Sequence, residues 1–592
     1  MPVTNVLDFD LVHRVEDDIT ERIESDSVMK SVLNAIRSGS LSRLEKNDGA
    51  TDRYDASIFT NTIGKDPDPT NQGSAGTCWI HGALNMMRRD FIERYELSSN
   101  FSFSIPHLQF WDKIEKFNEA LELIIQLRRR SINDDSLHAA YSHGVSDGGW
   151  FHTARDLILK YGVVPESAFS CRYNANHTSL INHRLKLLII EFASKVKRIN
   201  GDCPIDLEDY DRMTMDSGYE PLNVKTTLPK VECRRLKEEY MECAVKILVY
   251  AIGNPIYPDS KFDWTYTDKN GKKYIAEQIT PLTFLNDYCC FDYSKYVVIT
   301  NDPRPRYPYY YKYARNKYDQ RRPIRNGEYS KVDLESYINL PMRDIRQLVQ
   351  KQVDEGVPVA FTCDVNKYVD HTNNVLSLDV TEYGAAFGIP FYSTMSKADR
   401  IDYSVSWGNH IMTIVGYDIP GCAPDESEDG EDGEEGDTEI DDAEEESDDI
   451  PEPSAKRQKG VANSVGSAGT VREMQDSSIP QYYKVENSWG KYGTHKGYYL
   501  MNLPWMSEYT YDFVIHRDHL PAHVQRIDET IPTEIREGDG LAPIANDEES
   551  QRNMYRAQAM IDETMTYQMM TDEMMTDEMP NQKYGYKRKR EF

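Results

Sequence analysis

Long apolar runs are missing from this sequence of 592 residues, and no stretch of about 18 apolar residues that would cross a bilayer occurs. The first residues hold no basic segment followed by an apolar one, which is the pattern of a secretory leader. Basic residues are also scarce, with 68 Lys and Arg against 98 Asp and Glu, a formal net charge of −30. We therefore expect a cytoplasmic chain that neither enters a membrane nor binds nucleic acid in general.

The sequence also lacks the motifs of disulfide frameworks, metal sites and phosphate-binding loops. The nine cysteines are an odd number, and none has the paired C-x-x-C spacing of a disulfide framework or a zinc finger. No HExxH pair occurs, and neither does a phosphate-binding loop of the GxxxxGKS/T or GxGxxG type. We therefore expect reduced cysteines, no metal and no cofactor.

Half of the net negative charge lies in one segment. Residues 421–460 contain 18 acidic and 3 basic residues, which is a net charge of −15. A stretch of this composition cannot bury a core, so we expect 421–480 to be a disordered insert. A second polar segment, 546–592, is rich in methionine and ends in a basic run. We expect a solvated tail there, although methionine could also adapt such a tail to an apolar groove.

The remaining sequence has the texture of a globular protein, and its periodicity changes along the chain. Apolar residues at helical spacing predict helices at Ser27–Ile36, Pro106–Arg130, Leu185–Val196, Arg234–Ala251 and Asp344–Glu355. Apolar runs rich in β-branched and aromatic residues predict strands at Val357–Val365, His410–Tyr417, Tyr482–Asn487 and Gly497–Leu503. Helices dominate the first half and strands the second, which favours an α+β fold.

The strongest local motif is NQGSAGTCWIHGALNMM at residues 71–87. A glycine-rich turn is followed by apolar residues at helical spacing, so Cys78 stands at the first turn of a helix. Backbone N–H groups and the positive end of the helix dipole favour a thiolate there. The side-chain amide of Gln72 and the backbone N–H of Cys78 could stabilise an oxyanion at the sulfur. The alternative is a buried structural cysteine, the usual role of a single cysteine.

A nucleophile needs a base, and the base needs a residue that orients it. His410 opens the strand HIMTIVGY, and Asn487 closes the strand YYKVEN. If the two strands pair antiparallel with Tyr417 opposite Pro480, His410 lies opposite Asn487 at the open end of the hairpin. An Asn oxygen beside the imidazole fixes its tautomer and leaves the other ring nitrogen for the cysteine. Trp489 could shield this hydrogen bond from water.

Two other histidines compete for the role of base. His81 follows the cysteine by three residues on the same helix, so its ring should point along the helix and pack or face solvent. His495 falls in the polar segment KYGTHKG and should be exposed. Their positions favour His410.

The constellation resembles the papain-like cysteine peptidases, in which a Gln, a Cys-Trp helix start, a His and Asn-Ser-Trp-Gly follow in this order. It is most similar to the bleomycin hydrolase branch, because FWDKIEKFNEAL, SDGGWFHTARDLILKYGVVP, ITPLTF and NDPRP also occur in the expected order. The resemblance implies that Cys78 is the nucleophile, His410 the base and acid, Asn487 the orienting residue and Gln72 an oxyanion donor. It also implies that Gly148 and Gly149 form the strip that pairs with the substrate backbone.

The same resemblance implies a two-lobed papain-like fold, a hexameric barrel and an aminopeptidase whose C-terminal arm recognises the free N-terminus of a peptide. Residues 527–544 are similar to that arm, but 48 residues follow them, which differs from the family. Either the tail is removed or the cleft is capped differently. The expected domains are an arm at 1–50, a helical lobe at 51–194, a mostly helical insertion at 195–340, a β-rich lobe at 341–545 and the tail at 546–592.

Two alternatives to the aminopeptidase stay open on the sequence alone. An endopeptidase would follow if the tail leaves the cleft uncapped. A binding or chaperone-like protein on a peptidase scaffold would use the acidic insert and the basic tail. The basic runs at 456–459 and 587–590 also allow a nuclear location beside the cytoplasm.

Overall fold

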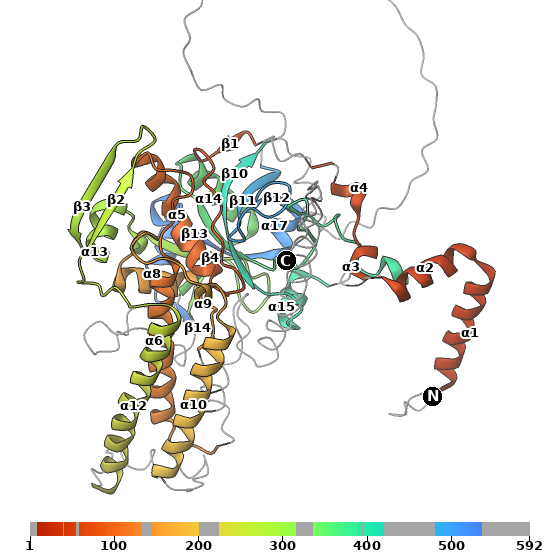
Figure 1. Ribbon diagram of the computed structural model, residues 1–592. Coiled ribbons are helices and arrows are strands. Elements are labelled where there is room, and N and C mark those ends of the chain that lie inside the picture. The colour runs from red at the N-terminus through yellow and green to blue at the C-terminus, as the bar shows by residue number, and fades with distance from the viewer. Residues whose placement is uncertain are drawn as a thin grey trace, which may run out of the picture.

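The computed structural model of the chain describes residues 9–39, 41–51, 53–54, 59–132, 137, 141, 145–200, 224–314, 336–389, 391, 395–419 and 480–535. Most of the long helices lie on one side, and a large sheet with a few helices packed against it lies on the other, which confirms the α+β class (Figure 1). The expected tail at 546–592 falls outside the described residues, and so does the expected acidic insert at 421–480, apart from its last residue. Among the helices of these ranges, none has the length and hydropathy that a bilayer crossing requires.

Most of the helical side is built from segments that the periodicity predicts, whereas the helix at Phe151–Tyr161 was not predicted. The longer helices there are α5 (Cys78–Arg94), α6 (Ile105–Gln126), α8 (Phe151–Tyr161), α10 (Ser179–Asn200) and α12 (Val224–Ala251). Helix α6 begins as expected, because the Ser104 hydroxyl accepts from the His107 N–H and Pro106 lies in the first turn. Helices α6, α10 and α12 project together from the body (Figure 1).

Within the described residues, the sheet side contains twelve strands in one sheet, in the order β14-β5-β6-β4-β13-β7-β10-β11-β12-β9-β8, with β1 also paired to β10. The strands are β1 (Asn61–Thr62), β4 (Tyr296–Thr300), β5 (Tyr311–Ala314), β6 (Ser336–Asn339), β7 (Val359–Cys363), β8 (Val369–Asp370), β9 (Val375–Leu376), β10 (His410–Asp418), β11 (Tyr482–Glu486), β12 (Tyr498–Asn502), β13 (Thr510–His516) and β14 (Thr533–Glu534). Helix α14 (Met342–Asp354) packs against them.

The chain has two main apolar cores, and β10 separates them. Ile411 belongs to the core under the helices, whereas Met412 and Ile414 belong to the core under the sheet. Side chains alternate between the two faces of a strand, so one strand serves both cores. Gly82 allows α5 to pack closely against β10, because a Cβ at that position would lie 2.6 Å from the Ile411 Cγ2.

The expected register of the hairpin is wrong, although β10 and β11 do pair antiparallel. Thr413 lies opposite Glu486, Tyr417 lies opposite Tyr483, and an irregularity separates Ile414 from Gly416. The strands are therefore shifted by two residues near the site and by three beyond the irregularity. A shift of two residues keeps every side chain on its face, whereas a shift of one would turn it over. His410 and Asn487 consequently still share a face.

The insertion expected at 195–340 is also not mostly helical in the described residues. Besides α12, the end of α10 and short helical segments at 281–289 and 293–295, it contains a two-stranded ribbon of β2 (Phe262–Thr267) and β3 (Lys273–Ile279), and then β4, β5 and β6 of the main sheet. The segment Tyr296–Thr300 is a fully buried YVVIT strand that pairs with β13. A short, buried, β-branched run suits a central strand, which the search for helical periodicity overlooked.

The first fifty residues form helices that the sequence analysis predicted only in part. Helix α2 (Ser27–Ser38) matches the prediction, and its N-cap Asp26 accepts from the Val28 N–H. Helix α1 (Phe9–Ser25) was not predicted, because many charged residues interrupt its apolar positions. Both helices lie away from the body of the chain (Figure 1).

Candidate active site

Helix α5 places Cys78 at its first residue, against strand β10. Thr77, the N-cap residue, makes no capping hydrogen bond with its side chain, so N–H groups of the first turn stay available. Burial raises the pKa of the Cys78 thiol to about 11, against hydrogen bonds from backbone N–H groups that lower it. The Ile411 N–H is one of these donors, which places the sulfur beside the residue that follows His410. The helix start therefore favours the thiolate as expected, but burial outweighs it.

His410 and Asn487 come together at the end of the β10–β11 pair. The His410 Nε2 lies 2.7 Å from the Asn487 Oδ1, and the Ser488 N–H donates to the same oxygen at 2.7 Å. Because that oxygen accepts from a backbone donor, it must also accept from the imidazole, so Nε2 carries the proton. The Nδ1 of His410 is then the nitrogen left to exchange a proton with the thiol.

Burial and an aromatic cover set the properties of this pair. Burial lowers the pKa of His410 to about 4, and the hydrogen bond to Asn487 opposes that shift. The Trp489 ring lies over the imidazole with centroids 4.8 Å apart and planes inclined by 35°. Since water is excluded on that side, the hydrogen bond between His410 and Asn487 keeps its strength. Burial therefore favours the neutral form of both the thiol and the imidazole.

Gln72 is joined to the Asn487 segment through a residue that sequence reasoning did not select. The Ser488 hydroxyl donates to the Gln72 Oε1 at 2.6 Å, and the Gln72 N–H donates to the Ser488 carbonyl at 2.9 Å. The Gln72 Nε2 donates to the Ala75 carbonyl at 2.8 Å, and its second hydrogen remains for a ligand. Ser488 belongs to the Asn-Ser-Trp-Gly motif, but only the folded chain shows its contact with Gln72, at the start of the glycine-rich turn.

The two glycines of the expected strip have different environments. A Cβ at Gly148 would meet nothing within 4 Å, so this residue borders open space. A Cβ at Gly149 would lie 2.6 Å from the Trp79 ring, so glycine is required there by packing. The Gly148 carbonyl accepts from the Lys116 Nζ at 2.6 Å. Within the described residues, the N–H and C=O of Gly149 have no protein partner and remain for a peptide.

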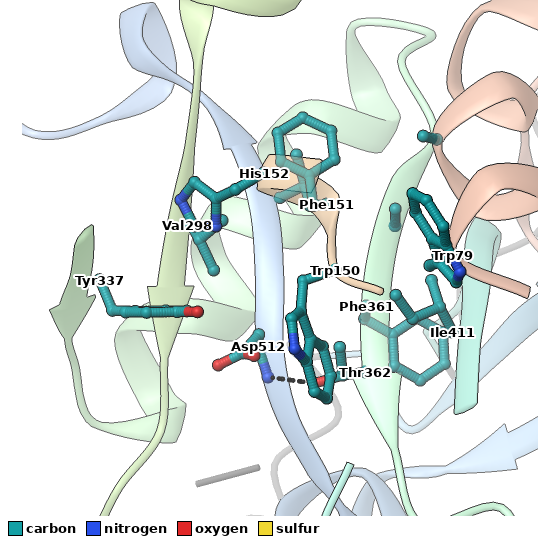
Figure 2. Close-up of a pocket in the computed structure, with 13 residues that line it drawn as sticks. Trp79, Trp150, Phe151, His152, Val298, Tyr337, Phe361, Thr362, Ile411 and Asp512 are labelled. Atoms are coloured by element: carbon teal, nitrogen blue, oxygen red, sulfur yellow. Dashed lines mark hydrogen bonds between the residues drawn. The ribbon is translucent and has the colours of Figure 1, made fainter. Parts of the chain in front are cut away.

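A pocket lies between α5, the start of α8 and the sheet, and its lining begins at the residue that follows this strip (Figure 2). Trp150, which follows the two glycines, lines it together with Trp79 of the nucleophile helix and Ile411 of β10 (Figure 2). Most of the lining is apolar, with Asp512 and His152 among the polar members. The pocket therefore adjoins both the strip and the elements that carry Cys78 and His410.

The competing histidines do not take part in this arrangement. His81 is buried, and its Nδ1 lies 2.8 Å from the Thr70 hydroxyl, which makes it a packing residue. His495 is partly buried rather than exposed, in the loop that precedes β12. His371, which sequence reasoning did not consider, packs its ring 5.3 Å from Trp489, on a loop without a recognisable motif. Elsewhere in the described ranges, no His, Cys, Asp and Glu group forms a metal site.

The family model described as the peptidase C1-like family matches residues 9–214, 221–426 and 467–542. The chain belongs to this family. The match covers both the segment with Cys78 and the segments with His410 and Asn487, and it therefore confirms the papain-like resemblance seen in the sequence.

Curated relatives of the chain have names from one branch of the family. The chain is 26% identical to aminopeptidase W of Lactobacillus delbrueckii subsp. lactis, over 80% of this chain and 86% of the relative. It is 25% identical to bleomycin hydrolase of Homo sapiens, over 82% of this chain and 89% of the relative. It is 26% identical to aminopeptidase C of Streptococcus thermophilus, over 89% of this chain and 98% of the relative. These names place the chain in the bleomycin hydrolase branch.

A solved structure supports the fold. The chain is similar to the crystal structure of PepW from Lactobacillus rhamnosis, with a TM-score of 0.68 and 22% sequence identity. The similarity covers 90% of this chain and 98% of that chain. The papain-like fold expected from the sequence is thereby confirmed.

Proposed function

We propose that this protein is a cysteine aminopeptidase that hydrolyses short peptides at their N-terminal residue through an acyl-enzyme. The observation that carries the proposal is the 2.7 Å hydrogen bond from the His410 Nε2 to Asn487, next to a buried thiol at the start of α5. The relatives named aminopeptidases favour this activity over the endopeptidase and binding-protein alternatives.

The first half of the reaction uses the thiol, the imidazole and two donors. The Cys78 sulfur attacks the substrate carbonyl while its proton passes to the His410 Nδ1, and the carbonyl oxygen becomes an oxyanion. The Cys78 N–H and the Gln72 Nε2 donate to that oxyanion. Ser488 fixes the Gln72 amide so that its NH₂ group, and not its oxygen, faces the site.

The second half returns the enzyme to its starting state. His410 gives its proton to the leaving amine as the C–N bond breaks, and a thioester with Cys78 remains. A water molecule then attacks the thioester, loses a proton to His410, and releases the acid while the sulfur recovers a proton. Asn487 stabilises the imidazolium at both stages because its oxygen accepts from Nε2 throughout.

Recognition of the substrate needs a backbone strip and a group for the free amine. The unused N–H and C=O of Gly149 suit the backbone of a bound peptide. The arm expected at 527–544 is described only to Ile535, where β14 pairs parallel with β5 and the Ile535 side chain is buried. The rest of the arm and the tail lie outside the described residues, so recognition of the amine by the arm is a proposal from the family.

A comparison of free and blocked substrates tests the aminopeptidase. We expect aminoacyl anilides with a free amine to be hydrolysed about 30-fold or more faster, in kcat/KM, than their N-acetyl forms, because a desolvated charge pair contributes about 2–5 kcal/mol. The mass of the mature chain should be measured on the same sample, since removal of the tail near residue 544 would expose the arm. Equal hydrolysis of free and blocked substrates by a chain with an intact tail would make the protein an endopeptidase.

The oligomer and the location are proposals from the same resemblance. We propose a homohexamer in the cytoplasm, and light scattering on the full chain should give a mass close to six times that of one chain. A monomer at micromolar concentration would contradict it. Nuclear residence stays a second outcome, and a tagged chain without residues 587–590 tests whether that basic run contributes.

A further inference from the structure

The Asp147 carboxylate lies where three parts of the site meet, and it is not a member of the proposed catalytic set. Its Oδ1 accepts from the Lys113 Nζ at 2.6 Å and from the Asn182 Nδ2 at 2.9 Å. Its Oδ2 accepts from the Gly76 N–H at 3.3 Å and from the Thr178 hydroxyl. One carboxylate thus joins α6, α10, the segment before α10 and the turn between Gln72 and Cys78.

The charge of this carboxylate is balanced inside the protein. The Lys113 side chain is 0% exposed, and its Nζ also donates to the Asn182 Oδ1 at 2.6 Å. Burial alone would raise the pKa of Asp147, but the Lys113 ammonium and the hydrogen bonds from Lys113, Thr178 and Asn182 hold it well below its usual range. Asp147 is therefore ionised at neutral pH, and all four acceptor positions are used.

The backbone of Asp147 adds two further connections. Its carbonyl accepts from the Trp79 Nε1 at 2.7 Å, which ties it to the second residue of the nucleophile helix. Its next residue is Gly148, the beginning of the strip, whose carbonyl is held by Lys116. The Lys116 ammonium lies 5.3 Å from the centre of the Trp79 ring and also donates to the Ser146 carbonyl. The strip is thereby fixed to the helix and to the turn.

We propose that Asp147, held by Lys113, is a positioning residue that sets the distance between the substrate strip and the oxyanion turn. This inference rests on the proposed function, because the strip and the turn have these roles only in a peptidase. Asp147 does not touch the reacting atoms. It acts through the Gly76 N–H on one side and through Gly148 on the other. A displacement of about 1 Å between such elements can lower a rate by about 100-fold.

Two variants separate positioning from simple stability. Asp147→Asn leaves the Lys113 ammonium buried without a counter-charge, and the double variant Asp147→Asn/Lys113→Met removes both charges. Asparagine offers one acceptor oxygen instead of two, so it cannot hold Gly76 and Asn182 together. We expect the double variant to regain most of the melting temperature lost by the single one. Its kcat/KM for a tripeptide should stay about 10-fold or more below that of the unchanged chain.

The rate of Cys78 alkylation by iodoacetamide separates a positioning role from a general loss of structure. A general loss of structure would change this rate, whereas a displaced substrate strip would not. This small reagent needs the thiol but no strip, so its rate should stay within about twofold in the double variant. Thr178→Val, which removes only one hydrogen bond to Asp147, should lower kcat/KM about threefold or more, and it serves if the other variants fail to fold. The matched control is Glu122→Gln/Lys237→Met, a largely buried pair that joins the far part of α6 to α12, and it should keep kcat/KM within about twofold.

Each outcome decides the inference. A double variant with at least half of the original kcat/KM would overturn it, as would a Thr178→Val variant with unchanged kcat/KM. An equal decrease in kcat/KM for the tripeptide and in the alkylation rate of Cys78 would show that Asp147 only stabilises the fold, which would also overturn the inference. If the unchanged chain itself fails to hydrolyse the tripeptide, the proposed function fails instead, and that result is visible before any variant is compared.

Discussion

Replacing Cys78 by alanine should lower kcat/KM for peptide hydrolysis by about 10⁴-fold or more, because loss of a nucleophile removes the covalent route altogether. Cys78 combines a helix start, amide donors to its sulfur and contact with the strand of His410. The side chain is small, so the free energy of unfolding should change by no more than about 1 kcal/mol. Hydrolysis of an aminoacyl anilide and a urea titration measure the two quantities.

The control for this experiment is Cys243→Ala, which removes an exposed thiol on α12. It should keep full activity, and iodoacetamide should still inactivate it. Activity of Cys78→Ala above about 1% of the original would contradict a thiol mechanism. The chain would then have to be explained as another kind of hydrolase or as a binding protein.

Replacing Glu486 by glutamine should lower the free energy of unfolding by about 3–5 kcal/mol, since it leaves buried guanidinium groups without their counter-charge. The Glu486 Oε1 accepts from the Arg88 Nη1 at 3.2 Å, and its Oε2 accepts from the Arg89 Nη2 at 3.1 Å. The side chains of Glu486, Arg88 and Arg89 are 1%, 2% and 4% exposed. This cluster joins α5 to β11 immediately before Asn487.

Urea titration of the Glu486→Gln variant gives the stability, and kinetics at low temperature give the effect on the site. We expect a lower kcat as well, because the β11 end that carries Asn487 is anchored by this carboxylate. The control is Glu191→Gln, whose ion pair with Lys195 is exposed and should contribute no more than about 0.5 kcal/mol. A Glu486→Gln variant as stable as the control would show that Asp66, which also binds Arg89, balances the cluster by itself.

Local sequence predicts the parts of this protein well where a short segment decides its own structure. The N-cap at Ser104, the apolar spacing after Cys78 and the apolar run from His410 are properties of a few neighbouring residues. Helix α5 begins at the predicted residue because the glycine-rich turn ends there. The family match then confirms the resemblance that the same motifs carry.

Pairings between distant segments were predicted less well. The hairpin register differs from the expected one by three residues at Tyr417 and by two near the site, and the irregularity between Ile414 and Gly416 accounts for the change from three to two. The prediction of His410 next to Asn487 survived only because an even shift preserves the face of the strand. The buried strand Tyr296–Thr300 was assigned to a helical insertion, since its partner β13 lies more than 200 residues away.

By itself the sequence determined the residue types of the site, their order along the chain and the helix start that holds Cys78. The tertiary structure alone decided how these residues are held. Ser488 donates to Gln72, Glu486 pairs with two arginines, and Asp147 links the strip to the oxyanion turn. Each of these contacts joins residues far apart in the chain, and a charged side chain shows its partner only when folding buries both. The physical reason is that local propensity acts over a few residues, whereas burial of charge is decided by the whole fold.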